Sequence, residues 1–193
     1  PAFAGMTNMK TLISVIIPTY KNKELFLNNL KHNLPFLKGC EIIVVNDGSS
    51  DKSRFRIRDL KFKNVTLLEH KINLGKGAAM KTGAEYAFAH GADAVIFMDS
   101  DAQHDPNDLS KFINCLKEGK YDVIFGSRNF SYGVPLIRFL GNKFASILMG
   151  YIFGVYISDV ICGFRALTKK GYEKIKWESD GYGVETEMVA RVG

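Results

Sequence analysis

The segment MDSDAQHDP, residues 98–106, places Asp99, Asp101 and Asp105 directly after the apolar run AVIF. Carboxylates held this close together repel one another, and a bound cation would relieve that repulsion. Two carboxylates separated by one residue can share a hard divalent cation such as Mg²⁺ with a diphosphate, because that ion prefers oxygen ligands. The alternative is a solvated turn in which the aspartates make only local hydrogen bonds. The spacing alone leaves both interpretations open.

The glycine-rich segment GKGAAMKTG, residues 75–83, offers a helix start that can approach a phosphate closely. It is not a P-loop, because no glycine precedes Lys81. It is not a dinucleotide fingerprint either, because Met80 stands where the third glycine or alanine belongs. A Rossmann oxidoreductase is therefore disfavoured. Three histidines are isolated in the sequence and are expected to be surface or core residues: His32, His70 and His90.

Five short apolar runs, rich in β-branched residues, alternate with segments of helical length and periodicity. Strands are expected at residues 12–19, 41–46, 65–70, 93–99 and 121–127, and helices at 22–36, 51–60, 76–90 and 106–119. Because the runs are apolar without alternation, they fit strands covered on both faces, as in a parallel sheet. The order predicts a single α/β domain with a doubly wound, mostly parallel, Rossmann-like sheet flanked by helices.

Polar clusters follow three of these strands: PTY at residues 18–20, NDGSSD at 46–51 and DSD at 99–101. Each cluster comes after the carboxyl end of its strand, which in an open α/β sheet is the edge where ligands bind. The three clusters are therefore expected to form one site at that edge.

The composition is that of an ordinary globular chain, with 46% hydrophobic and 24% charged residues among 193, so disorder is not expected. The net charge of +6 favours an anionic partner such as a nucleotide, a phospholipid face or a nucleic acid. Residues 1–10 are expected to be a cloning remnant or a disordered N-terminus, and residues 11–193 to form the domain, cut short within its last helix. The three dispersed cysteines form no metal-ligand pair and are expected to be reduced: Cys40, Cys115 and Cys162.

The motifs form an ordered series that resembles the inverting glycosyltransferases of family 2, which have the GT-A fold. Within that family the chain is similar to the branch of dolichyl-phosphate mannosyltransferases and bacterial polyprenyl-phosphate glycosyltransferases. The resemblance implies that residues 11–193 are a GT-A catalytic domain. It further implies transfer, with inversion, of a sugar from a GDP- or UDP-sugar to a polyprenyl (dolichyl or undecaprenyl) phosphate, with Mg²⁺ or Mn²⁺ as cofactor. The series runs from about residue 13 to residue 188 and comprises SVIIPTY, EIIVVNDGSSD, NLGKGAAMKTG, VIFMDSDAQHDP, VIFGSR, RFLGNKF, DVICGFRAL and GYGVETEM.

The resemblance also implies which residues hold the nucleotide-sugar donor. Asp47 would accept hydrogen bonds from the base or ribose, or would instead cap the following turn. The branch commonly has a glutamate two residues after the tyrosine, but this chain has Asn22 there and Glu24 two residues further on. The donor-binding residues would be Pro18, Thr19, Tyr20, Asn22, Glu24, Val45, Asp47, Lys76, Asp99, Ser100 and Asp101.

Within that set, Asp99 and Asp101 match the DxD pair that binds the metal, and Gln103 matches a further metal or diphosphate contact. Lys76 would reach the diphosphate, or would be a solvated lysine at a helix start. The residues expected to carry catalysis are Asp99, Asp101, Arg128 and Arg138.

On the acceptor side, Arg128, Arg138 and Asn142 match positions that hold the lipid phosphate. A guanidinium group suits this role because its fork binds phosphate through two hydrogen bonds. Each arginine could instead form a surface ion pair. Asp159 and Arg165 either pair with each other or order the acceptor loop.

A phosphate acceptor is already ionised at neutral pH, so a strong general base is not obligatory. Glu185 and Glu187 are the candidates if a base is needed.

Two other functions stay open. A family 2 transferase acting on a saccharide or teichoic-type acceptor would depend on Glu185 or Asp159 as base and would tolerate the loss of Arg138. A non-catalytic nucleotide-sugar-binding or scaffold module would bind the donor without turnover.

A lipid acceptor implies a membrane surface. The run FASILMGYIFGVYI, residues 144–157, is shorter than the roughly 20 residues that span a bilayer. It is expected to seat at the membrane interface, or to be buried in a core or against a partner. The protein is therefore expected at the cytoplasmic face of a membrane, peripheral or anchored by segments absent from this chain, with no nucleic-acid partner. The sugar, the choice between GDP and UDP, and the oligomeric state are left open.

Overall fold

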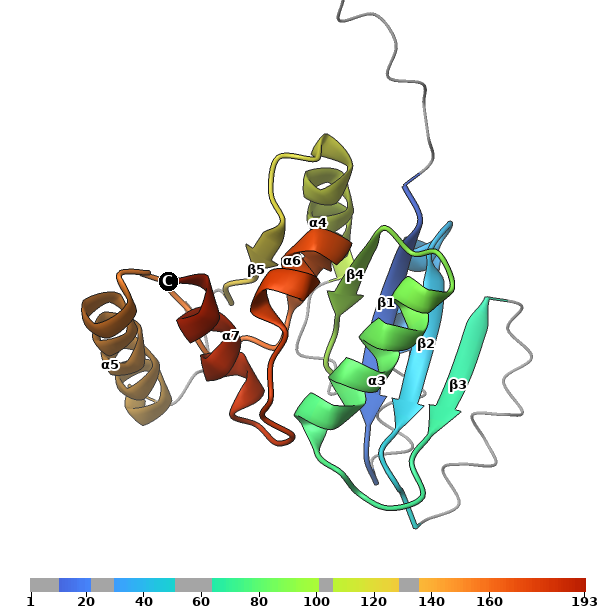
Figure 1. Ribbon diagram of the computed structural model, residues 1–193, viewed down its shortest axis with the longest axis horizontal. Coiled ribbons are helices and arrows are strands. Elements are labelled where there is room, and N and C mark those ends of the chain that lie inside the picture. Colours follow the sequence, from blue (N-terminus) through green and yellow to red (C-terminus); the bar gives the residue numbers. More distant parts are fainter. Residues whose placement is uncertain (1–10, 22–29, 51–63, 101–105, 129–135) are drawn as a thin grey trace, which may run out of the picture.

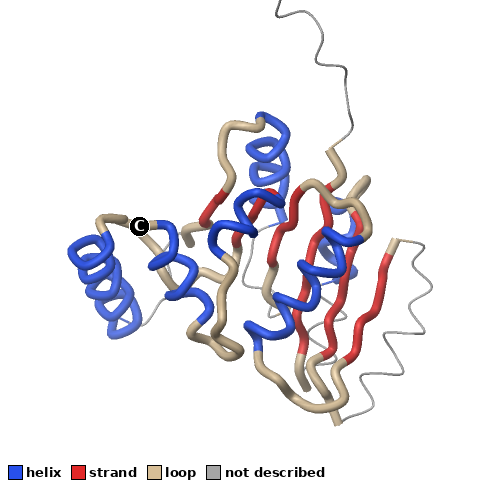
Figure 2. Tube along the Cα trace, viewed as in Figure 1, coloured by secondary structure: helices blue, strands red, loops and turns tan. Residues whose placement is uncertain are grey.

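The computed structural model describes residues 11–21, 30–50, 64–100, 106–128 and 136–193, without the side chains of residues 34, 106 and 136–139. A six-stranded sheet forms the centre of the molecule, and helices flank it (Figure 1). Figure 2 distinguishes the helices from the strands in the same view. The predicted α/β domain with a mostly parallel sheet flanked by helices is confirmed.

The sheet has the strand order β3-β2-β1-β4-β6-β5. Neighbours among β1 to β4 pair in parallel, whereas β6 is antiparallel to both β4 and β5. The five expected strands are all present, but β6 was not expected, because it begins with an arginine. The strands are β1 (Ile13–Thr19), β2 (Glu41–Asn46), β3 (Val65–Glu69), β4 (Ala94–Phe97), β5 (Val123–Phe125) and β6 (Arg165–Thr168).

Helices cover both faces of this sheet. Ile13, Val15 and Ile17 of β1 pack with η1 and α4 on one face, and Ile16 packs with α3, α6 and α7 on the other. Because both faces are covered, the strands carry no polar alternation. A Cβ atom at Gly83 would lie 2.5 Å from Ile16 Cγ2, so this glycine lets α3 lie close to the sheet. The helices are η1 (Leu34–Leu37), α3 (Lys76–Ala89), α4 (Pro106–Glu118), α5 (Leu136–Phe153), α6 (Lys169–Ile175) and α7 (Val184–Val192).

Helices α3 and α4 match two of the expected helices closely. Of the helix expected at 22–36, only residues 30–33 are described as α-helical, and η1 follows them; the helix expected at 51–60 lies outside the described residues. Residues 144–153 of the apolar run at 144–157 belong to α5, which begins earlier and ends at Phe153, before Gly154 at φ +71°. Helix α5 lies beside α7, away from the sheet (Figure 1). Within the described ranges, no helix has both the length and the apolar character that crossing a bilayer requires.

Candidate functional site

The segments that follow β1, β2 and β4 lie at one edge of the sheet. The Asp47 main-chain N–H donates to the Thr19 carbonyl (2.9 Å), and the Met98 N–H donates to the Ile16 carbonyl (3.0 Å). The sequence expectation of polar clusters converging at the carboxyl edge therefore matches the structure for the described parts of those clusters.

The expected donor-binding residues divide into those that the structure describes and those that it does not. Tyr20 is exposed, whereas Val45 is completely buried, so any contact from Val45 would come from its main chain. The residues at or beside the edge are Pro18, Thr19, Tyr20, Val45, Asp47, Lys76, Asp99 and Ser100. Those outside the described residues are Asn22, Glu24, Asp101 and Gln103.

The Asp47 carboxylate anchors the segment that leads into α3. It is buried, and it accepts hydrogen bonds from the main-chain N–H groups of Leu74 and Gly75, both at 2.8 Å. Gly75 has φ +103°, a left-handed conformation that glycine adopts without strain. Asp47 thus joins the end of β2 to the start of α3. This structural role is similar to the turn-capping role given above as the alternative for Asp47. A nucleoside that bound Asp47 would have to share its carboxylate oxygens with these two N–H groups.

His70 belongs to the same network, and the sequence reasoning treated it as isolated. Its Nδ1 lies 2.7 Å from Asp47 Oδ1, and its Nε2 lies 3.0 Å from the Thr82 hydroxyl on α3. Its main-chain N–H donates to the Asn46 carbonyl (2.9 Å). The available signal was its position, because His70 directly follows a strand that ends at the same edge as β2.

Lys76, Asp99 and Glu185 form a compact charged cluster. Lys76 Nζ lies 2.6 Å from Asp99 Oδ1 and 2.7 Å from Glu185 Oε1. The three side chains are mostly buried, with exposed fractions of 16%, 23% and 8% respectively. Burial lowers the pKa of Lys76, but the charges and hydrogen bonds of the two carboxylates outweigh burial and leave the pKa raised. The ammonium group is therefore held in its charged form between two anions.

This cluster tests whether a divalent metal suits the site. Asp99 and Glu185 already bind one cation, and carboxylate oxygens are the donors that Mg²⁺ and Mn²⁺ prefer. Among the residues that the structure describes, no group of three or more His, Cys, Asp or Glu side chains forms a metal site by itself. The chemistry of Asp99 thus fits a metal whose other ligands are water, substrate phosphates or the expected contacts of Asp101 and Gln103.

The loop between α6 and α7 covers the start of α3 and brings Glu185 to Lys76. The Trp177 indole N–H donates to the Gly77 carbonyl (2.9 Å), and the Ala78 N–H donates to the Asp180 carbonyl (3.0 Å). A Cβ atom at Gly77 would lie 2.0 Å from the Ser179 carbonyl oxygen, so only glycine permits this approach. The helix start is fixed against a segment that lies about 100 positions later in the sequence, as the Trp177 to Gly77 bond shows.

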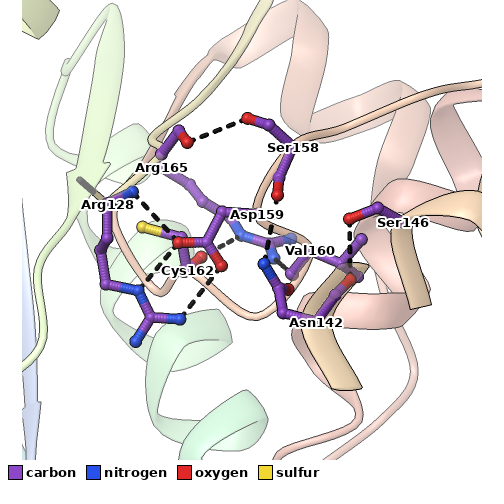
Figure 3. A network of polar contacts seen from close by, with 9 residues as sticks. Arg128, Asn142, Ser146, Ser158, Asp159, Val160, Cys162 and Arg165 are labelled. Carbon is purple, nitrogen blue, oxygen red and sulfur yellow. Dashed lines mark hydrogen bonds and ion pairs between the residues drawn. The ribbon is translucent and has the colours of Figure 1, made fainter. Parts of the chain in front are cut away.

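On the opposite side of Asp99, the loop from Ser158 to Phe164 links this cluster to Arg128. A Cβ atom at Gly163 would lie 2.1 Å from Asp99 Oδ2, so the glycine reserves space for that carboxylate. At the other end of the loop, Asp159 is buried and accepts two hydrogen bonds from the Arg128 guanidinium, from Nε (2.8 Å) and Nη2 (3.0 Å). Figure 3 shows these two dashed contacts. The hydrogen bonds that Arg128 donates to Asp159 raise the pKa of Arg128, and the negative charge of Asp99 contributes to the same rise.

The structure corrects the expected pairing of Asp159 with Arg165. Arg165 is fully buried and donates instead to the main-chain carbonyls of Val160, Cys162 and Glu185, at 2.6, 2.9 and 2.6 Å. Burial lowers the pKa of Arg165 to about 10. The guanidinium therefore ties the loop from Ser158 to Phe164 to the start of α7, which agrees with the alternative in which Arg165 orders that loop.

Asn142, on α5, contacts the same loop. Its Nδ2 donates to the Ser158 carbonyl (3.1 Å), and its main-chain carbonyl accepts from the Ser146 hydroxyl (2.9 Å), as Figure 3 shows. Its buried Oδ1 has no hydrogen-bond partner in the described part of the chain. Arg138 belongs to α5, but its side chain lies outside the description. The structure thus brings Arg128 and Asn142 to one loop and leaves the place of the Arg138 side chain open.

Helix α5 presents an apolar surface to solvent, whereas an ordinary surface helix buries its apolar face and exposes its polar one. Its buried side chains include the polar Asn142 and Ser146 together with Met149. The exposed face, called here the α5 apolar face, consists of Leu140, Phe144, Ile147, Leu148, Tyr151 and Ile152, with exposed fractions from 43% to 90%. A contiguous exposed apolar surface of this kind marks a site of contact with a protein or a membrane.

Comparison of the sequence with known proteins identifies relatives of this chain. Residues 14–176 match the family described as glycosyl transferase family 2. The chain is 31% identical over 177 residues to the UDP-N-acetylglucosamine–dolichyl-phosphate N-acetylglucosaminyltransferase of Methanococcus voltae, covering 82% of this chain and 70% of the relative. It is 30% identical over 190 residues to the polyprenol monophosphomannose synthase of Mycolicibacterium smegmatis, covering 92% and 70%.

A solved structure is similar in fold. The glucosyl-3-phosphoglycerate synthase of Mycobacterium tuberculosis, in complex with Mn²⁺, UDP and glucosyl-3-phosphoglycerate, matches with a TM-score of 0.66 at 20% identity. The match covers 93% of this chain and 64% of the synthase, so this chain spans less than two thirds of that protein.

Proposed function

Because the chain belongs to glycosyl transferase family 2, we propose that it transfers a sugar from a GDP- or UDP-sugar to the phosphate of a polyprenyl lipid, with inversion. The observation that carries this proposal is the loop from Ser158 to Phe164. At one end its Gly163 packs against Asp99, the expected metal ligand, and at the other its Asp159 holds Arg128, the expected acceptor ligand. A donor diphosphate and an acceptor phosphate could therefore bind on the two sides of one short loop.

On the donor side, Asp99 would hold Mg²⁺ or Mn²⁺, together with Asp101 and Gln103. The metal would neutralise charge on the departing diphosphate. Lys76 is placed at the first residue of α3, where the helix dipole also favours an anion. Its ammonium group, which the structure shows beside Asp99, would contact the same diphosphate.

On the acceptor side, Arg128, Arg138 and Asn142 would bind the lipid phosphate. The Arg128 fork is occupied by Asp159 in the structure, so the phosphate would share or replace that carboxylate. An ionised phosphate needs no strong base, and orientation for in-line attack is the main requirement. In agreement, the three carboxylates considered as bases, Glu185, Glu187 and Asp159, are all held in ion pairs with cations.

The α5 apolar face supports a lipid acceptor. Aromatic and aliphatic side chains such as Phe144, Ile147 and Tyr151 are the residues that seat a helix at the boundary of headgroups and acyl chains. Two relatives are named for dolichyl phosphate and polyprenol substrates, which are membrane lipids. We therefore place the chain at the cytoplasmic face of a membrane, with α5 at the lipid surface.

The test is transfer of radiolabel from a panel of GDP- and UDP-sugars to polyprenyl phosphate in detergent or vesicles, with Mg²⁺, Mn²⁺ or EDTA. We expect metal-dependent label in the lipid phase, reduced by Arg138→Lys, which keeps the charge but loses the fork. Lys120→Met is the control. It removes a charge from an exposed residue in the connection between α4 and β5, and it should keep full activity. Label in an oligosaccharide or teichoic-type acceptor, with none in the lipid, would replace this proposal with the saccharide-acceptor function. Donor binding without label in any acceptor would favour the non-catalytic module.

A further inference from the structure

The position of Lys76 between two carboxylates has a consequence for the order in which metal and donor bind. Its ammonium group lies against the Asp99 carboxylate, 2.6 Å from Oδ1, where a divalent cation bound to that oxygen would also have to lie. The same nitrogen lies 2.7 Å from Glu185. A divalent cation that approaches Asp99 therefore meets a positive charge that is already in place.

The lysine cannot leave by movement of its main chain. Its helix start is fixed on one side by Asp47, which binds the Gly75 N–H, and on the other by the Trp177 indole, which binds the Gly77 carbonyl. Only rotation of the side chain can move Nζ away from Asp99. A lysine side chain has four rotatable carbons and three donors, so it can exchange one anion for another without a change of backbone.

We propose that Lys76 is the resident counter-cation of Asp99, so that the site rejects a free divalent cation and accepts one only together with a nucleotide diphosphate. The inference rests on the function proposed above and adds the rule by which the donor site is filled. A lone dication beside Asp99 would repel the Lys76 ammonium group at close range, because only 2.6 Å separates that nitrogen from Asp99 Oδ1. A diphosphate supplies anionic oxygens that attract both the divalent cation and the Lys76 ammonium group. This attraction offsets the repulsion between the two cations.

Glu185 is a positioning residue in this scheme. It keeps Lys76 beside the site when the lysine releases Asp99, because it is the second anion bound to the same nitrogen. Glu185 is itself fixed, since it is buried and its main-chain carbonyl accepts from Arg165 (2.6 Å). Replacing Glu185 by glutamine would leave Asp99 as the only carboxylate of the pair for Lys76 and would strengthen the block against free metal.

The test measures binding of Mn²⁺ by electron paramagnetic resonance, first without nucleotide and then with UDP or GDP. We expect Lys76→Met to bind free Mn²⁺ about tenfold more tightly than wild type, a coupling of the usual size between neighbouring sites. In the presence of Mn²⁺ the same variant should bind UDP or GDP more weakly. This opposite change in the two affinities is the signature of a counter-cation, and a residue that only supported the fold would weaken both. Lys120→Met should leave both affinities unchanged.

Three outcomes decide the matter. If Lys76→Met binds free Mn²⁺ no more tightly than wild type while wild type binds Mn²⁺ and nucleotide together, the counter-cation inference is wrong and the proposed function stands. If wild type binds neither UDP nor GDP with Mn²⁺, the proposed function fails and the inference fails with it. Should Lys76→Met not fold, Lys76→Arg and Glu185→Gln replace it. Both should bind free Mn²⁺ as weakly as wild type or more weakly, and tighter binding would overturn the inference.

Discussion

The two halves of the proposed site hold their charged side chains in different ways. In the donor half, at the ends of β1, β2 and β4, Lys76 is shared between two carboxylates that come from distant parts of the chain. In the acceptor half, around the loop from Ser158 to Phe164, Arg128 is bound by both oxygens of a single buried aspartate. Arg165 is bound entirely by main-chain carbonyls.

This difference indicates how each half responds to a ligand. A lysine between two anions can pass to a third by rotation of its side chain, so the donor half is ready to bind. The acceptor half is fixed by two-point contacts, so a phosphate must displace or share Asp159 before Arg128 can bind it. We infer that donor binding requires little rearrangement and that acceptor binding requires more.

The largest effect should come from removing Asp99, the proposed metal ligand of the donor half. We expect Asp99→Ala to lower kcat/KM for sugar transfer by on the order of 1,000-fold, equivalent to about 4 kcal/mol of barrier, because charge on the leaving diphosphate loses its stabilisation. Asp108→Ala, which removes a surface carboxylate paired with Lys111 on α4, is the matched control and should retain activity. Near-normal transfer by Asp99→Ala would show that this aspartate is not a ligand.

The next effect concerns the rigid frame of the acceptor half. We expect Arg165→Met to lower the free energy of unfolding by roughly 3 to 4 kcal/mol, because three buried carbonyls lose hydrogen bonds to a charged donor. Arg191→Met on α7, where the arginine is partly exposed, should cost much less, because ion pairs at exposed sites contribute little to stability. Urea unfolding followed by circular dichroism measures both. Equal losses in the two variants would contradict the view that Arg165 holds the loop.

The same contrast explains how much of the fold could be predicted. The β1, β2 and β4 strands are apolar along their length and end in polar motifs, so local patterns identified both the strands and the edge where they meet. Strand β6 could not be predicted, because its first residue, Arg165, is a charge that is tolerated in a buried strand only through contacts with three distant carbonyls. Such contacts have no signature in the local sequence.

The candidate site divides in the same way. Asp47 and Asp99 were located because Asp47 directly follows β2 and Asp99 comes two residues after the end of β4. The partnership of Lys76 with Glu185 and of Arg128 with Asp159 could not be predicted, because the first pair is separated by 109 positions and the second by 31. The sequence supplied the right kinds of side chain, but tertiary packing determines which of them meet. The α6–α7 loop on α3 brings Glu185 to Lys76, and the loop from Ser158 to Phe164 brings Asp159 to Arg128.

A smaller effect would test the α5 apolar face, where the acceptor half meets the proposed membrane. We expect Phe144→Ser combined with Ile147→Ser to weaken binding to phosphatidylglycerol-containing vesicles by about tenfold or more, because both exposed side chains lose apolar area available for insertion. Stability in water should change little. Ile72→Ser, at an exposed apolar residue outside α5, is the control and should bind vesicles as wild type does. Equal vesicle binding by all variants in a sedimentation assay would remove α5 from the membrane surface.

The smallest effect concerns the loop that closes the donor half over α3. The Glu187 carboxylate accepts hydrogen bonds from the main-chain N–H groups of Glu178 and Ser179 and from Arg191. Burial raises the pKa of Glu187, but a hydrogen bond from the Ser179 side chain, together with those from the two main-chain N–H groups and Arg191, outweighs burial and lowers the pKa from 4.5 to about 2. Because the pKa is depressed in the folded state, the ionised carboxylate stabilises the fold above pH 4.5, and this contribution is lost as the pH falls from 4.5 towards 2.

We therefore expect Glu187→Gln to unfold at a lower temperature than wild type near neutral pH, and this difference to shrink steadily as the pH falls below 4.5. Thermal unfolding across that pH range measures the difference directly. Glu173→Gln, at an exposed position on α6, should follow wild type at every pH. A difference between Glu187→Gln and wild type that stayed constant with pH would mean that the carboxylate acts through its shape and not its charge. The closure of the α6–α7 loop over Lys76 would then owe nothing to the ionisation of Glu187.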